Sequence, residues 1–371
     1  MKNKLRKGLG LLKGIFNYNI LRHFKPLAPT GLQINVTYRC NSKCQMCHIW
    51  KVKPKNELSF REWQRIMRDQ IFSSTERLTI TGGEPTLHPE LVKLARLFIS
   101  SMPQLQFLVL VTNGFLTDRT ISLVKTLAKL SQGRGINFTV SVSLDGIGKM
   151  HDEIRGVPKA FEKTSSTILG LKELQAKYHF WLNVAGVAHR KNLYHIKDIQ
   201  QWCQRRGIDF NLQLVGFHKS YVQNIEKKQE LDFRENDKEY LHSILKKLSR
   251  PSFRRDLRYW LKCYYWNDML ALYRGGRRTT PCPFVLDAFV LDSLGDVYYC
   301  LSERKIGNCR QGKSVSEIYY HPKNLKFRRR LAKSACLKCN SACFVTSAIA
   351  KDFKKFIWYY FTRRRGPVGV Y

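Results

Sequence analysis

The chain has 371 residues, enough for two or three domains with a well-formed core, and its hydrophobic content of 43% is that of an ordinary folded protein. Its net charge of +37 is far from that of an ordinary protein of this size. It indicates attraction to nucleic acid, an anionic membrane surface or a phosphorylated substrate, unless it only keeps the surface solvated. No uninterrupted apolar run reaches the roughly 18 residues of a membrane span, so no spanning segment is expected.

The spacings of the eleven cysteines are typical of metal ligands and not of a small secreted protein held together by disulfides. No secretory signal is evident either: Lys13 interrupts the apolar run 8–16, and no small-residue cleavage site follows it. We therefore expect a cytoplasmic protein, in the reducing setting that suits oxygen-sensitive clusters, with peripheral attachment to a membrane as a further option.

The N-terminal segment, residues 1–29, contains no acidic residue, and five of its first thirteen residues are lysine or arginine. Leucines alternate with these charges, which predicts a basic amphipathic helix. We expect this helix to dock on the main domain and cap it, and attachment to an anionic membrane is the alternative. Pro26 and Pro29 are expected to end the helix.

Residues 30–221 predict six strands that alternate with helices. Runs rich in β-branched and apolar residues predict the strands at 31–38, 77–81, 107–112, 137–144, 181–188 and 210–217. Helical patterns occupy 58–71, 89–100, 118–131, 161–178 and 195–206. Ser59 with Glu62 three residues later reads as a capping box at the start of the first of these helices.

This alternation predicts an α/β fold in which right-handed crossovers curl a parallel sheet into a partial (β/α)6 TIM-like barrel. The active site of such a barrel lies at the carboxyl ends of its strands. Polar and glycine-rich segments follow the first four strands there: the cysteine loop 40–47, the turn 82–85, residues 112–114 and residues 145–146.

Cys40, Cys44 and Cys47 follow the first expected strand at C-x3-C-x2-C spacing. Thiolates are the usual ligands of iron–sulfur clusters, and three thiolates leave one iron of a [4Fe–4S] cluster open. An open iron indicates a reactive site rather than a sealed electron carrier. A zinc site is the alternative, but its fourth ligand would be His48, which directly follows Cys47 in an awkward geometry.

Together with Gly82-Gly83-Glu84-Pro85 after the second strand, this loop resembles the radical S-adenosylmethionine (radical SAM) superfamily. The resemblance implies that the amino and carboxylate groups of SAM chelate the open iron. It also implies reductive cleavage, in which one electron breaks the S–C5′ bond and yields methionine and a 5′-deoxyadenosyl radical that abstracts hydrogen from the substrate. The cofactor supplies this chemistry, and the protein positions the substrate C–H.

The resemblance further implies a set of contacts to SAM. Glu84 accepts a hydrogen bond from the ammonium group, and Gly82 and Gly83 let the backbone approach closely. Met46 stands where the family usually has an apolar or aromatic residue near the adenine. The polar positions around the ribose and carboxylate are Asn113, Ser143, Asp145 and Arg155, with Asn192 as a weaker candidate. For Ser143, Asp145 and Arg155 the alternative is a turn stabilised by a salt bridge. The guanidinium of Arg155 nevertheless matches the geometry of a carboxylate well.

A second cysteine set, C-x17-C followed by C-x2-C, resembles the SPASM/Twitch extensions of this superfamily, which hold auxiliary [4Fe–4S] clusters. The resemblance implies one cluster whose four irons are all ligated by cysteine. Its ligands would be Cys282, Cys300, Cys336 and Cys339, with Cys343 as the alternative to Cys339. Electron transfer or shaping of the pocket is its expected role, and zinc is the alternative. The remaining cysteines, Cys203, Cys263 and Cys309, are expected to be packed in the core.

We thus expect five parts along the chain: the N-terminal helix 1–29, the radical SAM core 30–221, a helical bridge 222–275, a small α+β SPASM/Twitch-like domain 276–345 and a basic aromatic tail 346–371. Short strands are expected at 284–291 and 296–301, with a hairpin turn at 292–295. In the tail, aromatic residues interleave with basic ones, which suits either a membrane interface or a helix packed on the domain.

The expected function is that of a radical SAM enzyme, of oxidoreductase or transferase-like type, whose unidentified substrate undergoes peptide maturation or sugar or alcohol oxidation. No peptide-leader-binding domain is obvious at the N-terminus, which weakens the maturase prediction. One alternative is a membrane-associated enzyme that acts on a lipid-linked or phosphorylated substrate. Another is a non-catalytic iron–sulfur protein that binds nucleic acid. The expected partner is an electron donor such as flavodoxin or ferredoxin.

Overall fold

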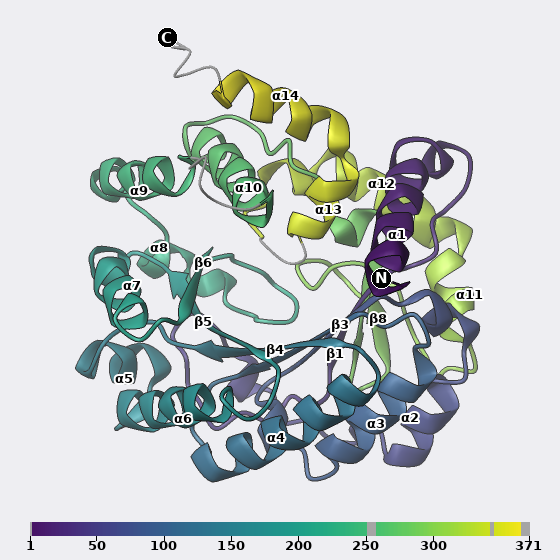
Figure 1. Cartoon of the computed structure of the whole chain (residues 1–371), viewed down its shortest axis with the longest axis horizontal. Coiled ribbons are helices and arrows are strands. Elements are labelled where there is room, and N and C mark those ends of the chain that lie inside the picture. The colour runs from purple at the N-terminus through teal and green to yellow at the C-terminus, as the bar shows by residue number, and fades with distance from the viewer. Residues whose placement is uncertain (1, 251–256, 342–344, 365–371) are drawn as a thin grey trace. The chain divides into compact units, whose positions relative to one another are not determined.

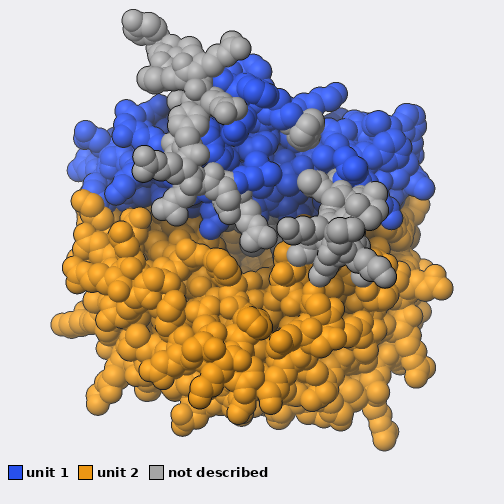
Figure 2. Space-filling model, viewed as in Figure 1, with its two compact units in different colours: residues 1–27, 234–287, 325–371 blue, residues 28–233, 288–324 orange. Residues whose placement is uncertain are grey.

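The computed structural model describes residues 2–250, 257–341 and 345–364. Two compact units make up the chain, coloured separately in Figure 2. Unit 2 comprises residues 28–233 and 288–324, and unit 1 comprises residues 1–27, 234–287 and 325–371. Cys343 and the end of the tail lie outside the described residues. The five-part division expected from the sequence stays a prediction.

Unit 2 is built on one curved sheet with the strand order β6-β5-β4-β3-β2-β1-β7-β8-β9. Its strands are β1 (Gly31–Asn35), β2 (Arg77–Thr81), β3 (Phe107–Thr112), β4 (Asn137–Ser143), β5 (Trp181–Ala188), β6 (Asp209–Leu214), β7 (Ala288–Asp292), β8 (Asp296–Tyr298) and β9 (Gly307–Asn308). Strands β1 to β7 pair in parallel, and β8 and β9 pair antiparallel. The six predicted core strands are therefore confirmed, as is the hairpin between β7 and β8.

The helices of unit 2 follow the outer side of this sheet (Figure 1). They are α2 (Phe60–Ile66), α3 (Leu91–Ser101), α4 (Thr117–Gly133), α5 (Lys149–Arg155), α6 (Ala160–Leu174), α7 (Ile196–Gln204), α8 (Lys228–Leu231) and α11 (Val315–Tyr320). Ser59 and Glu62 form the predicted capping box of α2. The helix is shorter than predicted, because Asp69 accepts a hydrogen bond from the Ile71 backbone and starts a separate 3-10 turn.

The core of unit 2 follows from the side-chain alternation of its strands. In β3 and β5, every second residue is buried, as expected where one face of a strand meets the covering helices. Strands β1 and β7 are neighbours in the sheet, and each is buried at all five positions, so both faces of these strands are covered. The loop that follows β1 is thereby held on a fully buried strand.

Unit 1 is helical in the residues that the structure describes. Its helices are α1 (Lys2–Asn19), α9 (Glu235–Leu248), α10 (Leu257–Tyr273), α13 (Val345–Lys351) and α14 (Phe353–Arg364), and α12 (Pro322–Lys333) enters it from the range of unit 2. Aromatic rings of α10 and α14 meet in its core, with Tyr264 4.9 Å from Tyr359 between ring centroids. Buried Lys351 pairs with Asp287. No helix of the described residues is long and apolar enough to cross a membrane.

Candidate functional site

The cysteine loop lies directly after β1 and is held by the backbone of α5. Lys43 N donates to Arg155 O at 2.8 Å, and Gln45 N donates to Ile154 O at 2.9 Å. From the other side, the Asn224 side chain donates to Met46 O at 2.7 Å. The loop therefore keeps its shape through contacts with segments that are distant in sequence.

The three thiols of this loop lie in a poorly solvated setting. Cys44 is buried, and Cys40 and Cys47 are partly buried. Burial raises the pKa of Cys40 and of Cys47 to about 12, so neither thiol ionises by itself at neutral pH. A bound metal centre deprotonates its coordinating thiols, and a set of three thiols on one short loop is the donor chemistry that an iron–sulfur cluster requires. The donor set therefore fits such a cluster.

The zinc alternative depends on His48 as the fourth ligand beside the three cysteines. No three histidine, cysteine, aspartate or glutamate side chains among the described residues converge as they would around one ion. His48, the possible fourth zinc ligand in the sequence, is buried, and its Nδ1 lies 2.8 Å from the Glu226 carboxylate and 3.1 Å from Gln223 O. The imidazole is thus engaged by the segment after β6.

The two glycines after β2 are required by a close approach within the chain. A Cβ atom on Gly82 would lie 2.4 Å from Thr37 O, and one on Gly83 would lie 2.2 Å from Arg39 O. Gly82 also has a φ of +141°, which side chains rarely adopt. Because Gly83 N donates to Thr37 O at 2.7 Å, the glycines bring the end of β2 against the start of the cysteine loop.

Glu84 is buried next to these glycines and accepts four hydrogen bonds. Its Oε1 accepts from Thr86 N at 3.1 Å, from Thr86 Oγ1 at 2.7 Å and from Thr112 Oγ1 at 2.7 Å, while Oε2 accepts from Asn113 N at 2.7 Å. Burial raises the pKa of Glu84, and these hydrogen bonds oppose the rise. Since Oε2 has one donor, it retains capacity for a further one.

Asn113, at the end of β3, ties this carboxylate to the cysteine loop. Its Nδ2 donates to Asn41 Oδ1 at 2.7 Å, and its backbone carbonyl accepts from Thr164 Oγ1 at 2.9 Å. The ends of β2 and β3 and the cysteine loop are therefore one hydrogen-bonded assembly. Of the predicted residues, this assembly contains the three cysteines of the loop, Met46, Gly82, Gly83, Glu84 and Asn113.

Asp145 and Arg155 form a buried ion pair beside the same loop. Arg155 Nη2 lies 2.6 Å from Asp145 Oδ2, and Arg155 Nη1 lies 3.5 Å from Cys44 Sγ. Asp145 Oδ1 accepts from Val187 N at 2.7 Å. The salt bridge of the alternative interpretation is thus present, and it also reaches the cysteine loop. Ser143 is the last residue of β4 and is partly buried.

Several polar residues of this rim were not predicted from the sequence. Tyr221 donates to Gly82 O at 2.7 Å, and Thr112 donates to Glu84. His189 and His151 are buried close to Asp145, and His151 Nδ1 accepts from Asp145 N at 3.0 Å. Thr112 lies in the segment 112–114 that was expected at this rim, but no role was predicted for it. The other three come from segments that no local pattern connects with the rim.

The predicted auxiliary cysteines fall in both units. Cys282, Cys336 and Cys339 belong to unit 1, and Cys300 belongs to unit 2. All four are partly buried, and none of the described cysteines forms a disulfide. In unit 1, buried Arg278 donates to Cys339 O at 3.1 Å and to Ser341 O at 2.8 Å, which shapes the loop around Cys339. Cys203, Cys263 and Cys309 are buried, as predicted.

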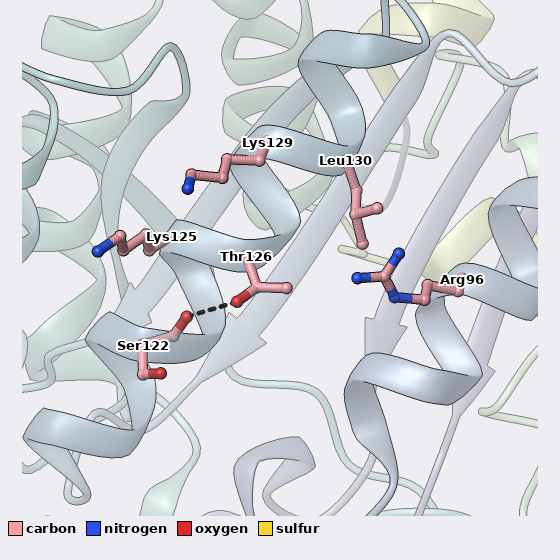
Figure 3. Close-up of a pocket in the computed structure, with 6 residues that line it drawn as sticks. All are labelled: Arg96, Ser122, Lys125, Thr126, Lys129 and Leu130. Carbon is pink, nitrogen blue, oxygen red and sulfur yellow. Dashed lines mark hydrogen bonds between the residues drawn. The ribbon is translucent and has the colours of Figure 1, made fainter.

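A hollow of about 380 Å³ lies on the outer helices of unit 2, away from the strand ends. Arg96 of α3 and residues of α4 line it, and Figure 3 shows Lys125 and Lys129 directed away from Arg96. The three cations therefore do not converge on a common point. This hollow contributes nothing to the rim described above.

Part of this chain is similar to a known family and to known proteins. Residues 34–189 match the family model described as the Radical SAM superfamily. The chain is 26% identical to the sporulation killing factor maturation protein SkfB of Bacillus subtilis (strain 168) over 184 residues, 48% of this chain and 40% of that protein. It is 34% identical to a GTP 3′,8-cyclase of Actinobacillus pleuropneumoniae serotype 5b (strain L20) over 145 residues, 35% of this chain and 40% of that enzyme.

The chain spans less than half the length of these two curated relatives. A solved structure, Streptococcus suis SuiB bound to S-adenosylmethionine, is similar over more of the chain, with a TM-score of 0.58, 17% identity and coverage of 88% of this chain and 75% of SuiB. At this identity the likeness concerns the fold. It confirms the predicted α/β class with a partial TIM-like barrel.

Proposed function

We propose that this chain, a radical SAM enzyme whose family domain occupies residues 34–189, cleaves SAM reductively at its cysteine loop and abstracts hydrogen from a substrate. The family uses a [4Fe–4S] cluster and SAM. The observation that carries the proposal is the hydrogen-bonded assembly of unit 2, in which the thiols, the glycine turn and Glu84 lie at one rim. Parallel barrels place their active sites at this end of the strands.

The proposed roles follow from the chemistry of each side chain. Cys40, Cys44 and Cys47 hold the cluster, which, when bound, supplies the electron that cleaves the sulfonium. Glu84 accepts from the SAM ammonium through the free capacity of Oε2. Arg155, buried beside Cys44, faces the carboxylate end of the same ligand.

The remaining predicted residues complete this site. Met46 is buried on the cysteine loop, in a position suited to the flat face of the adenine. The polar positions around the ribose are assigned to Asn113, Ser143 and Asp145. The Asn192 side chain already donates to Asp145 O at 2.8 Å and to Val187 O at 3.0 Å, so we assign it to the support of Asp145 rather than to the ribose.

The substrate is proposed only by class. One relative is by its name the maturation protein of a sporulation killing factor and another is a GTP cyclase, so relatedness at this distance does not choose the substrate. The chain also shares its fold with SuiB bound to its precursor peptide, over 93% of this chain and 77% of SuiB, and this fold is the ground on which we rank a peptide first. We therefore propose peptide modification first and sugar or alcohol oxidation second.

An auxiliary cluster is part of the proposal. Its ligands would be Cys282, Cys300, Cys336 and Cys339, with Cys343 as the rival of the last. The partly buried state of the four described thiols and the loop that Arg278 shapes around Cys339 support this assignment. In a net oxidation the cluster would accept the electron that the substrate radical gives up. A low-potential donor such as flavodoxin or ferredoxin would reduce the first cluster.

The test is anaerobic reconstitution, with iron and sulfide counted per chain and 5′-deoxyadenosine measured under strong reductant. Two clusters correspond to about eight irons and one cluster to about four. Cys44→Ala is expected to lose about four irons and all 5′-deoxyadenosine, and Cys300→Ala to lose about four irons while SAM is still cleaved. Cys203→Ala, a buried cysteine in α7, is the matched control. An intact cluster that forms no 5′-deoxyadenosine would overturn the proposal.

Peripheral attachment to an anionic membrane is a second proposal, carried by an exposed apolar stripe on unit 1. Leu12, Phe16, Ile20 and Phe24 recur every four residues along α1 and the turn after it, and their exposed fractions are 64%, 52%, 48% and 83%. Exposed Lys13, Arg22 and Lys25 flank them. On α14, Trp358 and Phe361 are 72% and 54% exposed. Exposed apolar side chains beside cations suit the interface of an anionic bilayer.

Vesicle co-sedimentation tests this second proposal. The chain is expected to bind vesicles that contain anionic lipid and to release them in high salt, because surface attraction is screened. A variant with Leu12→Ser, Phe16→Ser and Phe24→Ser should bind at least tenfold more weakly. Leu169→Ser, an exposed leucine on α6 of unit 2, is the control and should bind normally. Equal binding by both variants, or binding of RNA in place of vesicles, would contradict it.

A further inference from the structure

His189 is a buried polar residue that the proposed function does not use. It directly follows β5, at the same end of the sheet as the cysteine loop, and its side chain has no exposure to solvent. Its backbone N donates to Asn192 Oδ1 at 2.8 Å, and its Nδ1 accepts from Lys191 N at 3.3 Å. Since Nδ1 is an acceptor, the proton of the neutral ring resides on Nε2.

The ring is neutral at physiological pH, because burial lowers the pKa of His189 to about 4. Its Nε2–H donor has no hydrogen-bond partner among the described residues. Buried donors in native proteins are almost always paired, and one that is left without an acceptor is costly. At the carboxyl end of the strands, such an unpaired N–H is free to donate to an acceptor that binds from outside the chain.

A second unpaired donor lies in the same neighbourhood. Arg155 Nε is buried and also has no partner among the described residues, although the other nitrogens of its guanidinium reach Asp145 and Cys44. Asn192 ties the backbone of His189 to that of Asp145, the ion-pair partner of Arg155, because it accepts from His189 N and donates to Asp145 O at 2.8 Å. The charges of Asp145 and Arg155 both act on the His189 ring.

We infer that His189 Nε2–H and Arg155 Nε–H bind one carboxylate, that of SAM. Two N–H donors without acceptors, one on the residue after β5 and one at the end of α5, suit an anionic group with several lone pairs. The inference rests on the proposed function, because it assigns a further residue to the same ligand. His189 adds a neutral N–H donor beside the Arg155 guanidinium. Together the two donors fix the orientation of the carboxylate, and His189 contributes no charge.

Equilibrium binding of two ligands to the anaerobically reconstituted protein tests the inference. The probes are SAM and decarboxylated SAM, which differ in the carboxylate alone. His189→Ala is expected to weaken the binding of SAM about tenfold and that of decarboxylated SAM less than twofold. His189→Gln, which keeps an N–H donor, should restore part of the affinity for SAM. His195→Ala, an exposed histidine six residues further on, should bind both ligands as the wild type does.

The outcomes separate this inference from the proposed function. Equal weakening of both ligands by His189→Ala, with the cluster spectrum and melting temperature unchanged, would mean that His189 does not contact the carboxylate and would overturn the inference. Unchanged binding of SAM by His189→Ala would overturn it as well. If the wild-type protein with an intact cluster fails to bind SAM, the proposed function itself fails. Should His189→Ala lose the cluster, the comparison of the two ligands is made with His189→Gln.

Discussion

Arg155 connects Cys44 with Asp145: its Nη1 lies 3.5 Å from Cys44 Sγ, and its Nη2 lies 2.6 Å from the Asp145 carboxylate. Asp145 has no exposed surface and Arg155 very little, so the pair lies in a medium of low dielectric. Removal of one partner from such a pair leaves the other charge buried and uncompensated. The pair therefore stabilises the rim and holds a cation beside the thiols.

Arg155→Met is expected to lower the free energy of unfolding by about 3–5 kcal/mol, the usual cost of breaking a buried ion pair. Chemical denaturation of the reconstituted protein measures this. The double variant Arg155→Met, Asp145→Asn removes both charges and should recover part of the loss. Lys149→Met removes a cation of the same helix from an exposed pair with Glu153 and should cost at most about 0.5 kcal/mol. Equal losses in the two single variants would contradict the role of burial.

Asp292, at the carboxyl end of β7, makes the free energy of unfolding depend on pH, and the sign of this dependence follows from its pKa. Burial raises its pKa from 3.8 to about 6, so the folded chain binds its proton more tightly than the unfolded chain. The stability that this proton contributes is fully present below about pH 4 and is lost as the pH rises through about 6. Between pH 5 and pH 7 the loss is expected to be roughly 1 kcal/mol.

Asp292→Asn should remove this decline, although it also perturbs the hydrogen bond from Tyr38, which is 2.7 Å long in the native protein. Denaturation at several values between pH 5 and pH 8 gives the slope directly. Glu62 is the matched contrast, because its hydrogen bonds with Arg310 lower its pKa to about 2. Its contribution is present above about pH 4.5 and lost only as the pH falls toward 2, so Glu62→Gln should lower stability evenly across the measured range. A wild-type slope that survives in Asp292→Asn would refute the assignment.

The sequence alone predicted the strands with accuracy where a local pattern was strong. The expected runs 77–81, 107–112 and 181–188 have the same bounds as β2, β3 and β5. Each is an apolar or β-branched run bounded by turn residues, so the prediction needed only nearest neighbours. The handedness of the crossovers predicted that the parallel sheet curls into a partial barrel.

The pairing of strands that are distant in sequence could not be predicted from such local patterns. Gly31 of β1 pairs with Ala288 of β7, so strands of the predicted auxiliary domain extend the sheet of the barrel. No local pattern states which edge a strand will join. For the same reason the sequence did not predict the contacts of Tyr221 with Gly82 and of Asn224 with Met46. Both residues come from a segment that was assigned partly to a helical bridge. The sequence also did not reveal His189, since an unpaired donor is visible only once its surroundings are known.

Gly83→Ala tests the close approach that the glycine turn permits. The added Cβ would lie 2.2 Å from Arg39 O, a backbone atom that cannot move without displacing the cysteine loop. We expect the variant to retain less than about one tenth of the iron of the first cluster, while the far-ultraviolet circular dichroism changes little. Gly133→Ala, in the last turn of α4 with nothing within 4 Å of its added Cβ, should be neutral or stabilising by up to about 1 kcal/mol. Normal iron content in Gly83→Ala would contradict this reading of the turn.

Tyr221→Phe tests whether the segment after β6 positions the glycine turn. The Tyr221 hydroxyl donates to Gly82 O at 2.7 Å, and its ring meets that of Tyr38 edge-on with centroids 5.9 Å apart. Phenylalanine keeps the ring contact and removes the hydrogen bond, so Gly82 O loses its donor. We expect a loss of about 1 kcal/mol in the free energy of unfolding and about fivefold weaker binding of SAM. Tyr298→Phe removes a longer hydrogen bond, 3.3 Å to Asp292, and should leave SAM binding unchanged. If both variants bind SAM equally well, the Tyr221 hydroxyl stabilises the fold without positioning the turn.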